Sequence, residues 1–384
     1  MRVCSSRLWG GGRMLWSPLA IRDAGALESR PAGSVRAPMQ SERRPATGRD
    51  RRLQVRVSVF AVVLAVAALT LVSCQADPGA GSAAGRGGGS GQGYGSIGAA
   101  RAGTVAVVSA PLPGTTASYL GVFEIGAPSS VTPVHTFAAT VGRWPNIVLY
   151  YSGWNEAFQS RFAAAVRARG GTVLVDLAPT GVSLWSVAQG QRDAFLNSYA
   201  HEVRSYGHPV IISFAGEMNG SWYPYGWTHT SPALWVRAWR HIVTLFRRDG
   251  ATNVTWMWTV NRMTRGEGPI ADWWPGASYV NWTGIDGYVY YRSDTFAGIF
   301  GPTISAIRRL THEPIFIAET AVGQVAGQAA KIPMLFAGVK DYRLLGLLWF
   351  DVAQEGSIFK QNWRLEGHPA AVAAFRRAVT HYLK

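Results

Sequence analysis

The chain has 384 residues, a formal net charge of +15 and only two cysteines. Twelve arginines and four acids precede residue 57, so that stretch carries +8, and the remaining +7 is spread along the chain in single residues and pairs. This spacing excludes the continuous basic stripe that nucleic-acid binding requires. The cysteines are Cys4 and Cys74, so the chain after residue 74 cannot form a disulfide and depends on a hydrophobic core.

The first 73 residues are predicted to be a basic extension followed by an export signal. The run Val57–Ser73 is uncharged and rich in Val, Ala and Leu, but it is shorter than the roughly 20 apolar residues of a spanning helix. Residues 71–74, Leu-Val-Ser-Cys, resemble the lipobox of bacterial lipoproteins, which predicts lipidation at Cys74. We expect an exported protein held on the outer face of the cell membrane by this lipid. A plain membrane anchor and a cleaved signal with secretion are alternatives, and Met39 is an alternative start to Met1.

Residues 74–103 are rich in Gly, Ala and Ser, which is typical of a flexible tether. Within them Gly93–Gly98 matches the dinucleotide fingerprint G-x-G-x-x-G. No strand pattern precedes this match and no amphipathic helix follows it, so it predicts no nucleotide cofactor. Residues 104–384 remain as one folded domain.

The folded domain alternates between short apolar runs and helical patterns. Its length of about 280 residues suits one α/β barrel. Helical patterns with one apolar face lie between many of the runs. The sequence therefore predicts a (β/α)8 TIM barrel, with an open doubly wound sheet as the alternative. The eight apolar runs are residues 119–123, 147–151, 172–177, 210–214, 253–258, 282–286, 314–318 and 344–350.

The segment Ile211–Trp227 combines a strand pattern with a carboxyl group and several aromatic residues. Val210–Phe214 is β-branched and aromatic, as expected of a strand buried on both faces. Glu217 follows it, and the next eight residues contain Asn219, one Trp and two Tyr. Aromatic rings stack on the apolar faces of sugars, and a carboxylic acid can protonate a glycosidic oxygen. The segment favours a sugar site over a packed turn whose glutamate pairs with an arginine.

In a barrel of this kind the active site lies at the carboxyl ends of the strands. Two of the predicted strands end in a glutamate, the fourth with Glu217 and the seventh with Glu319. Asp286 and Tyr288 follow the sixth strand, and Trp154 follows the second. Strands three apart face each other obliquely across the barrel mouth, so the two glutamates could converge on one bond.

Three segments together resemble glycoside hydrolase family 26, the β-mannanase family of clan A. Phe214–Trp227 is similar to its acid/base segment, Ile317–Thr320 to its nucleophile segment and Val280–Tyr288 to its sixth-strand segment. The resemblance implies a retaining hydrolase in which Glu217 is the acid/base and Glu319 the nucleophile. Such a mechanism needs carboxyl groups about 5–5.5 Å apart whose pKa values are held apart.

The same resemblance implies which side chains contact the substrate. Tyr288 would hydrogen-bond the nucleophile, Asp286 would hold sugar hydroxyls, and Trp222 would stack on a sugar beside the cleavage point. Trp349 fits the aromatic floor that clan A barrels place after the eighth strand. The full set of predicted sugar-binding residues is Asn219, Trp222, Asp286, Tyr288, Trp349 and Trp154.

One departure from the family pattern lies beside the acid/base. The family usually has a His immediately before that glutamate, where this chain has Gly216. Two functions therefore stay open: an endo-acting β-glycanase, with mannan as the first candidate substrate and a β-linked glucan or xylan next, or a non-catalytic protein that binds carbohydrate or assembles envelope polysaccharide. The eight histidines are scattered without a ligand motif, so we expect no metal and no cofactor. We also expect a monomer.

Overall fold

The computed structural model describes residues 111–264, 267–354 and 360–383. The predicted signal segment, Cys74 and the tether lie outside these residues, so their prediction remains untested. Within the described residues, no helix is both long and apolar enough to cross a membrane.

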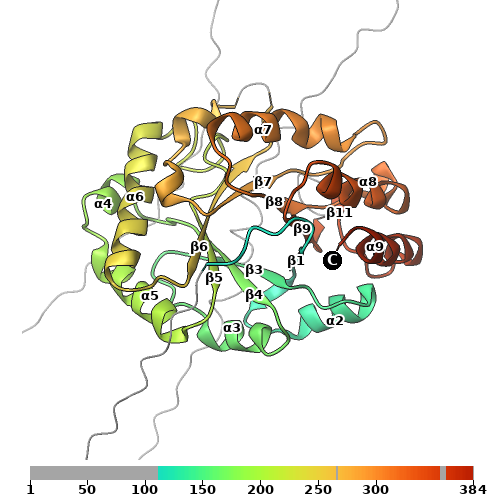
Figure 1. Ribbon diagram of the computed structural model, residues 1–384, viewed down its shortest axis with the longest axis horizontal. Coiled ribbons are helices and arrows are strands. Elements are labelled where there is room, and N and C mark those ends of the chain that lie inside the picture. The colour runs from blue at the N-terminus through green and yellow to red at the C-terminus, as the bar shows by residue number, and fades with distance from the viewer. Residues whose placement is uncertain (1–110, 265–266, 355–359, 384) are drawn as a thin grey trace, which may run out of the picture. The chain divides into compact units, whose positions relative to one another are not determined.

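Eight parallel strands close into a barrel, in which each strand is hydrogen-bonded to the next and the last to the first (Figure 1). This confirms the predicted (β/α)8 barrel and excludes the open sheet. Each of the eight apolar runs forms a strand, because a strand buried on both faces has no polar alternation. The strands are β1 (Tyr119–Phe123), β3 (Ile147–Ser152), β4 (Thr172–Leu177), β5 (Val210–Phe214), β6 (Val254–Asn261), β7 (Trp282–Asp286), β8 (Ile315–Thr320) and β9 (Gly346–Phe350).

Helices surround the barrel on its outer side (Figure 1). The main ones are α2 (Thr132–Val141), α3 (Ser160–Arg167), α5 (Asp193–Tyr206), α6 (Pro232–Arg248), α7 (Phe296–Leu310), α8 (Gln328–Asp341) and α9 (Pro369–Tyr382), with the short α4 (Leu184–Ala188) before α5. Three short strands, β2 (Ile125–Pro128), β10 (Ala353–Gln354) and β11 (Gln361–Asn362), and the 3₁₀ turns η1 (Ile270–Trp273), η2 (Ala277–Tyr279) and η3 (Gln324–Ala326) lie outside the barrel wall.

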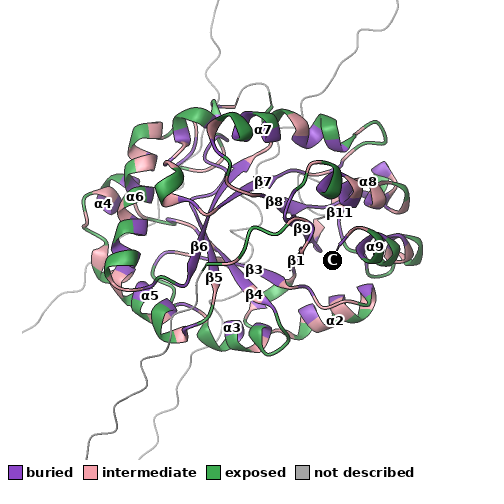
Figure 2. Cartoon of the chain, viewed as in Figure 1, coloured by how far each residue is buried: buried purple, intermediate pink, exposed green. Residues whose placement is uncertain are grey.

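The helix faces predicted from apolar spacing are the faces that pack on the barrel (Figure 2). On α6, Trp235 and Trp239 are at most 1% exposed and their rings stack 5.2 Å apart. The Ser231 hydroxyl caps this helix by accepting a hydrogen bond from the Leu234 amide. Burial of each such ring stabilises the fold by roughly 1.5–3 kcal/mol, and this layer fixes the strands whose carboxyl ends carry the polar residues described next.

Candidate active site

Four acidic side chains meet at the carboxyl ends of the strands. Asp176 lies near the end of β4, Glu217 follows β5, Asp286 ends β7 and Glu319 lies near the end of β8. Glu217, Asp286 and Glu319 are buried, and Asp176 is partly exposed. Asp286 is paired in register with Glu319, and neighbouring residues in register lie on the same face of a sheet. These carboxyl groups therefore face one shared space at the barrel mouth.

Glu319 is held by two tyrosine hydroxyls. Tyr151 of β3 donates a hydrogen bond to its Oε1, and Tyr288, in the loop after β7, donates one to its Oε2 at 2.6 Å. Burial and the nearby Glu319 charge raise the pKa of both tyrosines well above 10, so both keep their protons and remain donors. Each oxygen of Glu319 is thus a hydrogen-bond acceptor, which stabilises its ionised form.

Glu217 is positioned by a strained backbone and by two side chains. Its φ is +55°, and Ala215 has a φ of +48°, so two non-glycine residues adopt the left-handed region at a cost of roughly 1–3 kcal/mol each. The amide of Glu217 donates to the Thr259 carbonyl at 3.0 Å. Its Oε2 accepts from Trp222 Nε1 at 3.1 Å and its Oε1 accepts from Asn261 Nδ2. The carboxyl group is therefore fixed at both oxygens.

Burial and one negative charge set the order in which the carboxyl groups ionise. Burial raises the pKa of Glu319, while the two tyrosine hydrogen bonds lower it. Burial and the charge of Glu319 raise the pKa of Glu217 to about 8 and that of Asp176 to about 8. They raise the pKa of Asp286 well above its usual value as well. Glu319 therefore ionises first, and its charge keeps a proton on Glu217.

Aromatic side chains surround these carboxyl groups. Tyr223 and Tyr225, from the loop after β5, stack with their rings 4.8 Å apart and 11° from parallel. On the other side, the ring of Trp363 lies 5.0 Å from that of Tyr288. A set of carboxyl groups between aromatic rings is the arrangement expected at a carbohydrate site, since the acids bind hydroxyls and the rings cover apolar faces.

The structure brings together in this space five of the predicted site residues: Glu217, Glu319, Trp222, Asp286 and Tyr288. Asp286 is 4% exposed, and its Oδ1 has no hydrogen-bond partner among the described residues. Trp222 contacts the Glu217 carboxyl through its indole N–H, a role that the sequence did not predict.

Asn219 does not face this space, so its prediction as a sugar-binding residue is wrong. It is fully buried. Its Oδ1 accepts from the Asn261 amide at 2.9 Å, and its Nδ2 donates to the Asn261 carbonyl at 3.0 Å. A side-chain amide can replace a missing strand partner in this way, so Asn219 supports Asn261, which in turn holds Glu217.

The predictions for Trp349 and Trp154 also need correction. Trp349 is fully buried, its ring lies 5.3 Å from that of Phe375 on α9, and its Nε1 donates to Asp351. It points outward because strand side chains alternate, and the inward position belongs to Phe350. Trp154 is 7% exposed, with its ring 4.7 Å from that of Phe195. Both rings are core residues, so neither is an open platform for a sugar.

Two residues of the site were not singled out from the sequence. Tyr151 and Asp176 are paired in register on β3 and β4, and both lie inside runs interpreted only as buried strands. A signal was present for Asp176, because it is an acid inside an otherwise apolar run. Asn261, the last residue of β6, follows the fifth apolar run, where the sequence marks it as a polar residue and a weaker candidate for sugar binding.

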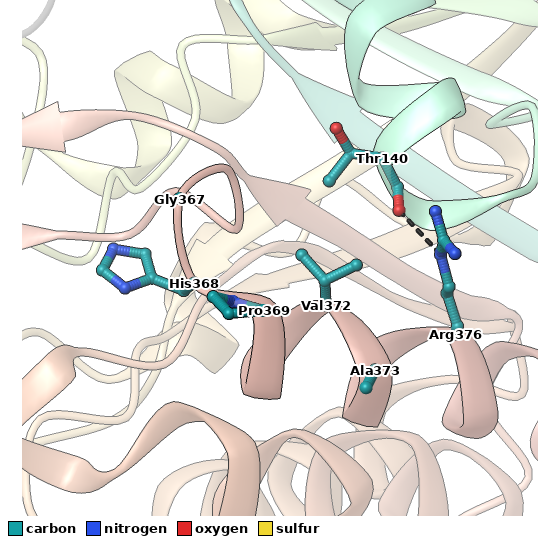
Figure 3. Close-up of a pocket in the computed structure, with 7 residues that line it drawn as sticks. All are labelled: Thr140, Gly367, His368, Pro369, Val372, Ala373 and Arg376. Atoms are coloured by element: carbon teal, nitrogen blue, oxygen red, sulfur yellow. Dashed lines mark hydrogen bonds between the residues drawn. The ribbon is translucent and has the colours of Figure 1, made fainter.

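Among the described residues, no group of three or more His, Cys, Asp or Glu side chains could hold a metal ion. A separate surface pocket between α2 and α9 has no carboxyl group in its lining. Figure 3 shows the Arg376 guanidinium in this pocket donating to the Thr140 carbonyl, at 2.8 Å. The carboxyl groups at the barrel mouth are therefore the candidate active site.

Comparison with known proteins gives a family match over the second half of the barrel. Residues 190–365 match the family model described as Glycosyl hydrolase family 26. This range includes both glutamates and covers somewhat less than half of the chain.

Two curated relatives and one solved structure are similar to the chain. Endoglucanase H of Acetivibrio thermocellus is 28% identical over 272 residues, which are 66% of this chain and 30% of that protein. A β-1,3-xylanase of a Vibrio species is 28% identical over 102 residues, 26% of this chain and 21% of that protein. The catalytic domain of a family 26 endo-β-1,4-mannanase from Bacillus sp. JAMB-750 has a TM-score of 0.55 at 16% identity, with 70% of this chain and 87% of that chain covered. The chain thus spans less than a third of the length of these two curated relatives. The solved mannanase domain has the same fold as this chain.

Proposed function

We propose that this family 26 domain is a retaining, endo-acting β-glycoside hydrolase in which Glu217 is the acid/base and Glu319 the nucleophile. The observation that carries the proposal is the position of Glu217 beside a Glu319 carboxylate that two tyrosine hydroxyls stabilise. Glu319 accepts hydrogen bonds from two tyrosine hydroxyls, while Glu217 lies beside the Glu319 charge, which raises the pKa of Glu217 to about 8. At neutral pH one group is a nucleophile and the other a proton donor.

The reaction then proceeds in two displacements. In the first, a Glu319 oxygen forms a bond to the anomeric carbon as the glycosidic bond breaks, and Glu217 gives its proton to the leaving oxygen. The ester removes the negative charge of Glu319, so the pKa of Glu217 falls and its carboxylate can act as a base. In the second, Glu217 takes a proton from water as that water attacks the anomeric carbon and releases Glu319. The two inversions leave the configuration unchanged.

The substrate proposed is a β-linked polysaccharide, with mannan tested first. A family 26 match and the mannanase name of the structural neighbour favour mannan. The names of the two curated relatives add a β-glucan and a β-1,3-xylan as candidates. We further propose that lipidation at Cys74 holds the enzyme at the outer face of the cell membrane, where it acts on polysaccharide outside the cell.

A non-catalytic carbohydrate-binding role is the second candidate, and Gly216 is the observation that favours it. An enzyme without the usual imidazole beside its acid must position that acid by other means. Trp222 and Asn261 do so here, because each donates a hydrogen bond to one oxygen of Glu217. This pair of contacts makes turnover the better supported proposal.

The test uses the full chain, purified in detergent, against β-mannans, mixed-linkage glucans, β-1,3- and β-1,4-xylans and envelope polysaccharide. Reducing ends are measured beside the Glu319→Ala variant. Release by the parent alone, as oligosaccharides and with retained anomeric configuration by NMR, supports the proposal. A folded parent that is retained on one of these polysaccharides and releases no sugar would show that the binding role is correct.

A further inference from the structure

Asp176 is a carboxyl group of the site that has no part in the proposed reaction and that the family resemblance did not assign to sugar binding. It is the last residue of β4 whose side chain faces the inside of the barrel. Its register partners are Tyr151 on β3 and Ser213 on β5. Tyr151 reaches the Glu319 carboxyl from this row, so Asp176 points toward the same space as its neighbour. The side chain is partly exposed, so its carboxyl group can be reached from the barrel mouth.

The Asp176 carboxyl group lies close to Gly216. A Cβ built on Gly216 would lie 3.5 Å from Ser213 Oγ and 3.7 Å from Asp176 Oδ2, which are ordinary contact distances. The φ of Gly216 is outside the left-handed region, so the backbone there does not require glycine. A Cβ at this position would thus touch its neighbours without a clash, and the Asp176 carboxyl group is one of those neighbours, next to the residue that precedes Glu217.

The charges around Asp176 show which groups share this space with it. The charge of Glu319 raises the pKa of Asp176, and Asp176 in turn raises that of Glu217 and Asp286. None of the ion pairs among the described residues includes Asp176. A carboxyl group without a cationic partner, facing a sugar site, is suited to hydrogen-bond hydroxyl groups, which can act as both donors and acceptors.

We propose that Asp176 is a specificity residue that hydrogen-bonds a hydroxyl of the sugar unit held between Glu217 and Glu319, from the β4 side of the site. The inference rests on the proposed function for the position of that sugar. It means that discrimination at this unit comes from a carboxyl group on β4, and that a side chain at position 216 would compete with the sugar hydroxyl for the Asp176 oxygen.

The test compares Asp176→Ala and Asp176→Asn with the parent on the oligosaccharide that the parent cleaves and on a series of its monodeoxy analogues. Asp176→Ala should lower kcat/KM by about 10- to 100-fold, the effect of losing one hydrogen bond to a charged or acidic group. Removal of one particular hydroxyl should impair the parent but should have little further effect on Asp176→Ala, because the two changes remove the same contact. A purely structural role would lower kcat/KM equally for every analogue.

Asp341→Asn, an exposed substitution at the end of α8, is the matched control and should leave kcat/KM unchanged. If Asp176→Ala does not fold, Asp176→Asn decides, since it keeps the shape of the side chain and should still change the order of preference among the analogues. The inference is overturned if either folded variant shows the same relative kcat/KM values over the monodeoxy analogues as the parent.

The two proposals fail in different ways. If the parent cleaves an oligosaccharide and Asp176→Ala matches it on every analogue, the specificity role is wrong and the hydrolase stands. If the parent cleaves nothing but binds an oligosaccharide by calorimetry, the hydrolase is wrong, and a loss of about 10-fold or more in the affinity of Asp176→Ala supports the specificity role. If the parent neither cleaves nor binds any oligosaccharide, both proposals are overturned.

Discussion

Two pairs of carboxyl groups at the carboxyl ends of the barrel strands are built in opposite ways. Glu217 and Glu319 each have their own donors, from β6 and the β5 loop for one and from β3 and the β7 loop for the other. Glu124, after β1, and Asp351, after β9, instead hydrogen-bond each other. The first pair can therefore hold one charge and one proton in separate places, while the second pair shares a proton.

The second pair joins two strands. Asp351 Oδ1 accepts from the Leu365 amide at 2.8 Å and from Trp349 Nε1 at 3.0 Å. Burial and the neighbouring Asp351 charge raise the pKa of Glu124 to about 10, and burial raises that of Asp351 to about 6. Glu124 is thus a proton donor to the Asp351 carboxylate. The comparison teaches that a buried acid at a strand end becomes reactive only when its partners leave it free to exchange its proton with a ligand.

The largest effect should come from removing the nucleophile of the first pair. Glu319→Ala should lower kcat by about 10⁴-fold or more, because it removes the carboxylate that is proposed to form the covalent intermediate. Steady-state kinetics on the polysaccharide that the parent cleaves gives the number. A loss of less than about 10-fold would place the nucleophile elsewhere.

Removal of the acid should have a smaller effect that depends on the leaving group. Glu217→Ala should lower kcat/KM on polysaccharide by about 10²- to 10⁴-fold, whereas bond cleavage in an aryl glycoside with an acidic phenol needs no proton and should be slowed much less. In the parent, kcat/KM should fall above a pH of about 8, where Glu217 loses its proton. Equal losses on both substrates would contradict the acid role.

The two tyrosines test how the charge on Glu319 is maintained. Tyr151→Phe and Tyr288→Phe each remove one donor to the ionised carboxylate, so the pKa of Glu319 should rise and the acid limb of the kcat/KM profile should move to higher pH. Each substitution should lower kcat/KM by about 10-fold near pH 6. A profile that keeps its acid limb in both variants would show that these hydroxyls do not stabilise the charge.

The smallest effect should come from a substitution in the second pair, Glu124 and Asp351. It should change the free energy of unfolding and leave kcat unchanged. The folded pKa of Glu124 lies above that of the unfolded chain, so its contribution to stability is fully present below a pH of about 4.5 and is lost as the pH rises toward 10. Glu124→Gln cannot ionise and should be more stable than the parent at pH 9, with unchanged kcat. Urea midpoints at pH 5, 7 and 9 measure this, and a parent that is the more stable protein at pH 9 would refute it.

The barrel was predictable because its strands are apolar on both faces and are separated by clear helical patterns. All eight runs form strands, and only their ends shift by a residue or a few. The helical patterns are weaker at α7, which contains Pro302, and at α8, which contains Pro333. The strand β2 follows β1 so closely that no separate signal marks it.

The site was less predictable, because a side chain's direction depends on strand register. Glu217 and Glu319 follow apolar runs and are visible as polar residues at strand ends. Tyr151 lies within such a run, so only its pairing with Asp176 and its contact with Glu319 show that it faces the mouth. For Trp349 the opposite holds: the family resemblance implied an open ring, but alternation along β9 turns the ring toward α9.

The left-handed backbone at Glu217 also has an evolutionary consequence. Glycine is the residue that adopts such a φ without strain, so a chain that kept only the barrel would gain stability by replacing this glutamate with glycine. Selection for folding alone therefore favours loss of the acid. The presence of a glutamate here runs against that preference, as expected if the residue is kept for the proposed reaction.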